Sequence, residues 1–209
     1  MIENYNLRHN RDMLEYEREH FARYGRICGV DEAGAGPLAG PVCAAAVVMP
    51  RGVLIDGVDD SKKITAARRV QVREKILALA ITWSVVFVDN KEIDEINILQ
   101  ARLKAMRLAV EGLLGGADFA LVDGHVSPGL VIPHITIKKG DALSHSIACA
   151  SILAKVARDE VMAGVYHEMY PQYGFDKHKG YGTKAHFAAI AEYGVSPIHR
   201  RSFLQGKAD

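Results

Sequence analysis

The spacing of hydrophobic and polar positions predicts a sheet whose first two strands are joined by a short turn. An apolar run over 27–31 and an unbroken one over 42–49 are both typical of buried strands. The glycine- and proline-rich stretch at 34–41 leaves room only for a tight connection, which favours an antiparallel pair at the centre of the sheet. Further strands are predicted at 82–88, 119–123 and 132–137.

Helical periodicity alternates with these strands in the rest of the chain. Amphipathic spacing is clearest over 97–114, where Gly115 and Gly116 end the helix. Other helices are predicted at 9–24, 66–81, 144–169 and 184–193. This order predicts a mixed-sheet α/β fold in a single catalytic domain, 1–209, with a helical lead-in over about 1–25 and a helical extension over about 170–209.

Composition narrows the class without naming a function. Hydrophobic residues make up 49% and charged residues 24%, enough for a core and unlike a disordered chain. No run approaches the ~18 apolar residues of a membrane span, and the N-terminus is too charged for a signal peptide. Cys28, Cys43 and Cys149 lack zinc-site spacing and lie in apolar runs, which favours reduced cysteines in a cytoplasmic protein without membrane association.

Four acidic residues follow apolar segments and are the candidate chemistry. Asp31 and Glu32 end one predicted strand, Asp123 ends another, and Asp141 precedes the long helix. Carboxylates aimed at one point repel each other unless a cation lies between them, and Mg²⁺ prefers such oxygen ligands. Two ions about 4 Å apart would suit phosphodiester hydrolysis. The alternative is that each acid caps a helix or lies in a solvated loop.

The glycine-rich stretch from Gly34 to Gly40 follows a strand and so invites a nucleotide-binding interpretation. Such fingerprints need a helix to start within the glycines, whereas Pro41 and an apolar strand follow here. A P-loop motif is also absent from the sequence. A tight turn beside Asp31 is therefore favoured, with backbone N–H groups that could approach a sugar or a phosphate closely.

An ordered set of motifs resembles the bacterial ribonuclease HII (type 2 ribonuclease H) family. The matching segments are GVDEAGAGPLAGP at 29–41, DSKK at 60–63, IDEINIL at 93–99, VDG at 122–124, KGD at 139–141, ASILAKVARD at 150–159, YGF at 173–175, HKGY at 178–181 and HRRSF at 199–203. The resemblance implies a ribonuclease H-like fold, with a mixed five-stranded sheet flanked by helices and a C-terminal helical extension. It also implies an endonuclease that uses Mg²⁺ or Mn²⁺ in a two-metal mechanism. Its substrates would be the RNA strand of RNA–DNA hybrids and single ribonucleotides in duplex DNA, cut on the 5′ side to leave 3′-hydroxyl and 5′-phosphate ends.

The same resemblance assigns roles to individual residues. The metal-binding and catalytic carboxylates would be Asp31, Glu32, Asp123 and Asp141, with Asp159 a weaker, supporting candidate. Substrate would be bound by Gly34, Ala35 and Gly36 through backbone N–H groups on the 2′-hydroxyl, by Tyr181 on a neighbouring deoxyribose and by Lys62 on a phosphate. The alternatives are an exposed loop tyrosine for Tyr181 and a solvated lysine for Lys62.

Ala35 departs from the family pattern, which has arginine between the glycines. Backbone contacts survive this change, but a guanidinium contact to phosphate is lost. We therefore expect impaired cleavage. A non-catalytic hybrid-binding variant and an unrelated Mg²⁺-dependent phosphatase are the rival interpretations.

The C-terminal portion has a local excess of positive charge, although the formal charge of the chain is only +1. Residues 170–209 contain six Lys or Arg against three acids, with His178, His186 and His199 interleaved among them. Such a composition suits phosphate contacts along a duplex, or a segment pinned by Arg200 and Arg201 to an acidic face. No heptad or interface stripe is present, so we expect a monomer.

Overall fold

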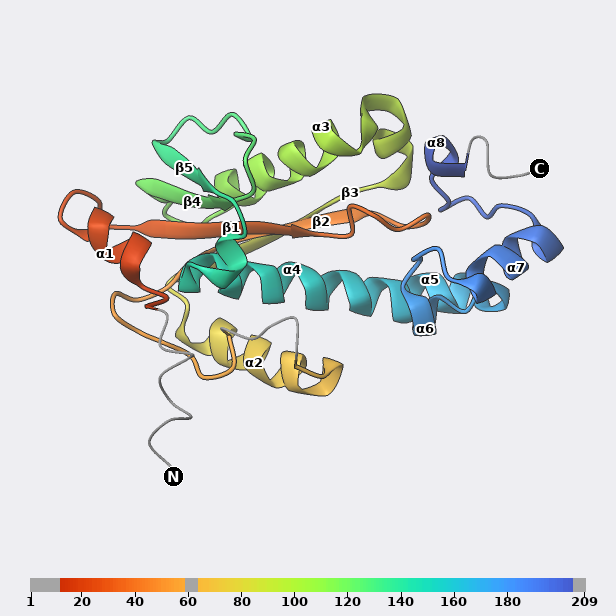
Figure 1. Cartoon of the computed structure of the whole chain (residues 1–209), viewed down its shortest axis with the longest axis horizontal. Coiled ribbons are helices and arrows are strands. Elements are labelled where there is room, and N and C mark those ends of the chain that lie inside the picture. The colour runs from red at the N-terminus through yellow and green to blue at the C-terminus, as the bar shows by residue number, and fades with distance from the viewer. Residues whose placement is uncertain (1–11, 59–63, 205–209) are drawn as a thin grey trace, which may run out of the picture.

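A mixed five-stranded sheet forms the middle layer of the protein, as the sequence predicts (Figure 1). The computed structural model describes residues 12–58 and 64–204. The strand order is β3-β2-β1-β4-β5. The strands are β1 Ile27–Ala33, β2 Val42–Val48, β3 Thr82–Val88, β4 Phe119–Asp123 and β5 His134–Ile137.

The central strand β1 combines both kinds of pairing. It runs antiparallel to β2, with Val30 opposite Ala46, and parallel to β4, with Val30 opposite Val122. Every residue of β2 is buried, which explains its unbroken apolar sequence. The predicted antiparallel pair at the centre of the sheet is therefore confirmed.

Long helices cover both faces of the sheet (Figure 1). Residues of α2 (Ala66–Leu79) and α4 (His145–Ala163) form one core with alternate β2 side chains, while α3 (Asn90–Glu111) packs on the opposite face. The shorter elements are α1 Glu15–Phe21, η1 Gly140–Ala142, α5 Val165–Met169, η2 Pro171–Tyr173, α6 Phe175–His178, α7 Lys184–Tyr193 and α8 Arg201–Leu204. None of the helices within 12–58 and 64–204 is both long and apolar enough to cross a membrane.

The helices predicted at 97–114 and 144–169 differ from the observed ones for local reasons. Helix α3 starts at Asn90, ahead of the predicted 97, and is interrupted at Asn97, whose backbone has φ 66° and ψ 164°. The Asn97 Oδ1 accepts from the Gln100 N–H and so caps the second segment of the helix. The predicted helix 144–169 is likewise divided, because Gly164 leaves the helical region between α4 and α5.

The lead-in helix is shorter than predicted, since α1 covers only Glu15–Phe21 and residues 9–11 lie outside the described chain. Its buried Glu17 accepts hydrogen bonds from the Ser144 hydroxyl at 2.7 Å and the Ser146 N–H at 2.9 Å. A carboxylate at this helix N-terminus satisfies donors that lack intrahelical partners. Glu17 thereby attaches α1 to the start of α4.

Close packing of α4 on β1 requires glycine at position 29. A Cβ there would lie 2.0 Å from the carbonyl carbon of Ser146, which is backbone and has no other rotamer to adopt. We expect Gly29→Ala to lower the free energy of unfolding by about 1–3 kcal/mol through overpacking. Urea unfolding followed by circular dichroism measures this. Gly36→Ala is the matched control, because a Cβ at Gly36 meets nothing within 4 Å; equal unfolding midpoints for the two variants would contradict the prediction.

Candidate active site

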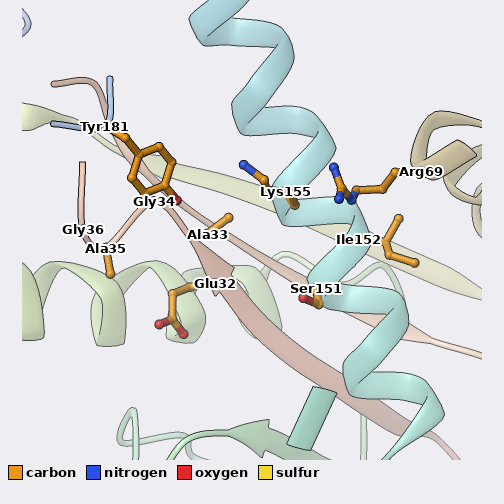
Figure 2. Close-up of a pocket in the computed structure, with 10 residues that line it drawn as sticks. All are labelled: Glu32, Ala33, Gly34, Ala35, Gly36, Arg69, Ser151, Ile152, Lys155 and Tyr181. Atoms are coloured by element: carbon orange, nitrogen blue, oxygen red, sulfur yellow. The ribbon is translucent and has the colours of Figure 1, made fainter. Parts of the chain in front are cut away.

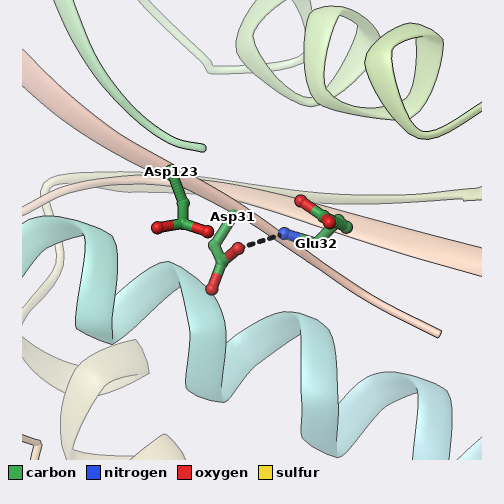
Figure 3. Close-up of side chains that lie close together, drawn as sticks. All are labelled: Asp31, Glu32 and Asp123. Atoms are coloured by element: carbon green, nitrogen blue, oxygen red, sulfur yellow. Dashed lines mark hydrogen bonds between the residues drawn. The ribbon is translucent and has the colours of Figure 1, made fainter. Parts of the chain in front are cut away.

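Three of the predicted carboxylates meet at one edge of the sheet (Figure 3). Asp31 and Glu32 lie near the end of β1, and Asp123 ends the parallel neighbour β4. Parallel strands bring their carboxyl ends to the same edge, so residues 92 positions apart become neighbours. One oxygen from each of the three carboxylates lies within 4.8 Å of the others.

Asp141, the fourth predicted ligand, lies next to this group but outside the 4.8 Å set. It is buried in the short helix η1, between β5 and α4. The preceding residue touches the group directly, because the Gly140 N–H donates to Asp123 Oδ1 at 2.6 Å. The structure therefore holds the Asp141 segment against Asp123 without bringing its carboxylate into the three-residue set.

Burial and mutual repulsion disfavour negative charge within the group. Burial raises the pKa of Asp31 well above its ordinary value of 3.8, and the charges of Glu32 and Asp123 raise it further, while a hydrogen bond from Ser151 opposes both. The pKa of Glu32 is also raised by burial, against the lowering effect of the Arg102 guanidinium, which lies 3.0 Å from Glu32 Oε1. A cation would relieve this conflict.

The glycine-rich turn beside the acids is held from inside the protein by Arg200. This arginine is fully buried and donates to the carbonyl oxygens of Gly34 at 2.6 Å, Ala35 at 2.9 Å and Gly40 at 2.9 Å. Burial and the nearby Arg158 charge lower the pKa of Arg200 to about 9, which leaves it protonated near neutral pH. Its charge is thus compensated by backbone oxygens.

Arg158, on α4, holds the second half of the turn in the same way. It is fully buried and donates to the carbonyl oxygens of Pro41 at 2.9 Å, Ala39 at 3.1 Å and Lys179 at 3.1 Å. Its guanidinium also explains Gly34, whose φ is +90° and where a Cβ would lie 2.0 Å from Arg158 Nε. The two arginines fix the turn in a shape that only glycine permits at position 34.

A cavity of about 410 Å³ lies between the turn and the helices, directly beside the carboxylates (Figure 2). Glu32 belongs to both the cavity wall and the acidic group. The backbone of Gly34–Gly36 forms one wall, and Arg69 from α2 and Lys155 from α4 add positive charge to the lining. The cavity lining therefore combines the Glu32 carboxylate with two cations, an arrangement suited to a phosphate near a bound metal.

Of the other predicted site residues, only Tyr181 lies at the cavity among those that the structure describes outside the turn and the acids. Tyr181 lines the cavity, and the Lys155 ammonium lies 5.6 Å from its ring centroid. Lys62 falls outside the described residues. Asp159 accepts from Lys155 Nζ at 2.7 Å and does not belong to the carboxylate group. It follows Ser151 by eight helical residues, about 12 Å along α4, so the geometry does not favour a role beside the metal.

Sequence reasoning assigned no role in the site to several residues that line or hold it: Arg69, Arg102, Ser151, Lys155, Arg158 and Arg200. Ser151 and Lys155 are four residues apart in the 150–159 segment, and this helical spacing on the same face as the acids could have identified them. Arg102 had no such signal, because it comes from α3, and its pairing with Glu32 depends on the tertiary fold.

The C-terminal charge is only partly at the surface, which corrects the prediction of a basic contact face. Arg200, His186 and His199 are buried, and Arg200 binds carbonyl oxygens rather than an acidic face. Arg201 is exposed and contacts Asp94 through its backbone, whose N–H donates to Asp94 Oδ2 at 2.9 Å. Exposed Lys177 and Lys184 remain available for phosphate contacts.

The family model described as Ribonuclease HII matches residues 28–205, which include all of the residues placed in this site. The chain belongs to the ribonuclease HII family. It is accordingly an endonuclease of the ribonuclease H class, a phosphodiester hydrolase.

Individual relatives agree with this assignment. Ribonuclease HII of Caldicellulosiruptor saccharolyticus is 56% identical over 182 residues, covering 87% of this chain and 88% of the relative. Ribonuclease HII of Geobacter sulfurreducens is 56% identical over 180 residues, covering 86% and 82%. Among solved structures, ribonuclease H2 from Pyrococcus horikoshii OT3 superimposes with a TM-score of 0.71 at 28% identity, covering 85% of this chain and 93% of that one.

The raised pKa of Asp31 predicts that this carboxylate destabilises the metal-free protein. At a pH below its unfolded pKa, near 3.8, Asp31 is protonated in both states and has no effect. As the pH rises towards the higher folded pKa, the unfolded state loses its proton first and folding loses free energy. We therefore expect Asp31→Asn to raise the Tm in EDTA at about pH 8, and the gain to shrink towards about pH 4.

Thermal unfolding in EDTA across this pH range measures the effect. Asp159→Asn is the matched control, because its carboxylate pairs with Lys155 and should give no such gain. An Asp31→Asn protein no more stable than the unmodified chain at about pH 8 would contradict the prediction.

Proposed function

We propose that this chain is a metal-dependent endoribonuclease that hydrolyses the RNA strand of RNA–DNA hybrids. We further propose that it cuts on the 5′ side of single ribonucleotides embedded in duplex DNA, leaving 3′-hydroxyl and 5′-phosphate ends. Family membership supports the ribonuclease H activity. The observation that carries the finer proposal is the convergence of Asp31, Glu32 and Asp123 beside a cavity walled by a glycine-rich backbone.

The carboxylates fit a divalent cation by their chemistry and their surroundings. Oxygen ligands from Asp31, Glu32 and Asp123 lie close enough to share an ion. Glu32 Oε2 is buried with no hydrogen-bond partner within the described part of the chain, as expected of an atom that ligates a metal. We propose that these three and Asp141 hold Mg²⁺ or Mn²⁺, which would activate water and stabilise the leaving oxygen.

The chain's own residues would select and orient the substrate. Because Arg200 and Arg158 occupy the carbonyl oxygens of the turn, the backbone N–H groups of Gly34–Gly36 are suited to a ribose 2′-hydroxyl in the cavity. Tyr181 would pack on the neighbouring deoxyribose. Lys155 and Arg69 would bind a phosphate on the far side from the acids.

The two rival interpretations have less support. Membership of the ribonuclease HII family gives no support to an unrelated phosphatase. A binding protein without activity would need a defect in the metal site, yet the Asp31, Glu32 and Asp123 carboxylates are present and adjacent. The buried free cysteines Cys28, Cys43 and Cys149 are consistent with the proposed action in the reducing cytoplasm.

Substrate choice and the ligand set can be tested together. We expect divalent-metal-dependent cutting of duplexes with one or four ribonucleotides and none of all-DNA duplex. Asp31→Asn, Glu32→Gln, Asp123→Asn and Asp141→Asn should each reduce kcat by roughly 10²-fold or more, because each removes a negatively charged oxygen ligand. Gel analysis of end-labelled strands gives both the rate and the position of the cut.

Asp159→Asn serves as the control for these variants, since Asp159 lies away from the acidic group and should keep most of the activity. Cleavage of all-DNA duplex, or hydrolysis of nucleoside triphosphates, would refute the substrate assignment. Full activity in Asp141→Asn would remove that residue from the ligand set.

Position 35 gives a second test, because its side chain is partly exposed on the cavity wall. Ala35→Arg would add a guanidinium within reach of a substrate phosphate. A contact worth about 1–3 kcal/mol corresponds to a rise in kcat/KM of roughly 5- to 150-fold on a duplex with one ribonucleotide. Ala35→Met is the uncharged control of similar length. Equal kcat/KM for the arginine variant and the unmodified chain would show that the alanine costs nothing.

A further inference from the structure

Three histidines of the C-terminal extension form a buried cluster that the proposed chemistry does not use. His186 and His199 are almost completely buried, and their Nε2 atoms lie 3.0 Å apart. The ring of His178 stacks on that of His186, with centroids 4.4 Å apart and planes inclined by 21°. Phe175 and Tyr173 pack edge-on against the cluster. Shielding from water in this way strengthens each hydrogen bond inside the cluster.

Backbone donors determine where the protons of this cluster lie. The Ser196 N–H can only donate, so His199 Nδ1, at 2.9 Å, accepts. The His199 proton is then on Nε2 and is donated to His186 Nε2. His186 must in turn carry its proton on Nδ1, which donates to the Tyr181 carbonyl oxygen at 3.0 Å. The result is one directed chain of hydrogen bonds from Ser196 to Tyr181.

His178 holds the other side of the same segment. Its Nδ1 accepts from the Gly180 N–H at 3.2 Å, so its Nε2 donates to the Tyr173 carbonyl at 2.8 Å. The His178 carbonyl accepts from the Tyr181 N–H at 2.9 Å. The backbone of Tyr181 is therefore fixed through its N–H by the His178 carbonyl. Its own carbonyl accepts from His186 and also from the Thr183 N–H at 2.8 Å.

The chain of hydrogen bonds joins Tyr181 to the segment that holds the glycine-rich turn. His199 precedes Arg200, which holds the carbonyl oxygens of Gly34 and Ala35. Tyr181 lines the cavity beside that turn (Figure 2). We propose that His199 and His186 are positioning residues that fix Tyr181 relative to the glycine-rich turn, and so set the space available to the nucleotide. This inference rests on the substrate-binding role proposed above for Tyr181.

The surroundings keep both imidazoles neutral, as this arrangement requires. Burial lowers the pKa of His186 and of His199 to about 4, and the neighbouring histidines add to the effect. Burial also lowers the pKa of His178, where the nearby Asp176 charge opposes this effect and the Lys179 charge adds to it. A protonated His186 would have no lone pair to accept from His199.

A double-mutant cycle on the full chain tests the inference. On a duplex with one ribonucleotide, we expect His186→Leu to raise KM roughly three- to tenfold, as for loss of a hydrogen bond, with kcat little changed. His186→Asn keeps a donor near the Nδ1 position and should recover part of this loss. Tyr181→Ala should also raise KM, and adding His186→Leu to it should change KM by less than about twofold. His20→Leu, on α1, is the control for loss of a remote histidine.

The outcomes distinguish failure of the role proposed for Tyr181 from failure of the role inferred for the histidines. If Tyr181→Ala leaves KM unchanged, the proposed role of Tyr181 fails and the inference falls with it. If Tyr181→Ala raises KM but the two substitutions multiply, only the inference is overturned, because His186 then acts by another route. Side-chain ¹⁵N NMR provides an independent check: His186 protonated on Nδ1 and His199 on Nε2 near neutral pH support the inference, and the opposite tautomers refute it.

Discussion

The parallel pairing of β1 with β4 is the constraint on which the site depends. It places Asp31 beside Asp123 at one edge of the sheet, although the two are far apart in sequence. The close contact of α4 with β1 at Gly29 then brings Ser151 to Asp31 and Lys155 to the adjoining cavity. A change in the register of β1 would disrupt all of these contacts at once, because each of them depends on the position of β1.

The glycine-rich turn that forms one wall of the cavity depends on buried positive charge rather than on apolar packing. Arg158 and Arg200 lie in the interior and bind six backbone carbonyl oxygens between them. A charge buried without partners is costly, so each guanidinium requires a backbone shaped to receive its donors. This mutual requirement links the glycine-rich turn to α4 and to the C-terminal segment, and it explains why the extension matters to a site formed mostly from the sheet.

The sequence was most informative where the residue types alone indicate the local structure. Apolar runs ending in acids correctly predicted β1, β4 and the meeting of Asp31, Glu32 and Asp123. It was least informative where a side chain binds backbone groups that are far away in the sequence. Arg200 was expected near the surface, but it is buried and donates to the Gly34 carbonyl oxygen. The interruption at Gly164 was missed because the predicted helix 144–169 runs through it, whereas the helix predicted from 97 missed the helical segment that precedes Asn97. The side chain of Asp141 lies outside the 4.8 Å set for a related reason, since its position depends on the short helix η1.

The distribution of charge in the cavity, rather than the net charge of the chain, gives the site its polarity. Carboxylates lie at one side, and Arg69 and Lys155 contribute positive charge elsewhere in the lining. A nucleic-acid backbone brings one negative charge for each phosphate, so in the proposed function one phosphate would lie at the cation that the acids would hold and the next at Arg69 and Lys155. The turn at Gly34–Gly36 lies in the same lining, where it could meet the sugar that joins those two phosphates. The proposed backbone contacts therefore depend on this separation of charge within one lining, and not on the formal charge of +1.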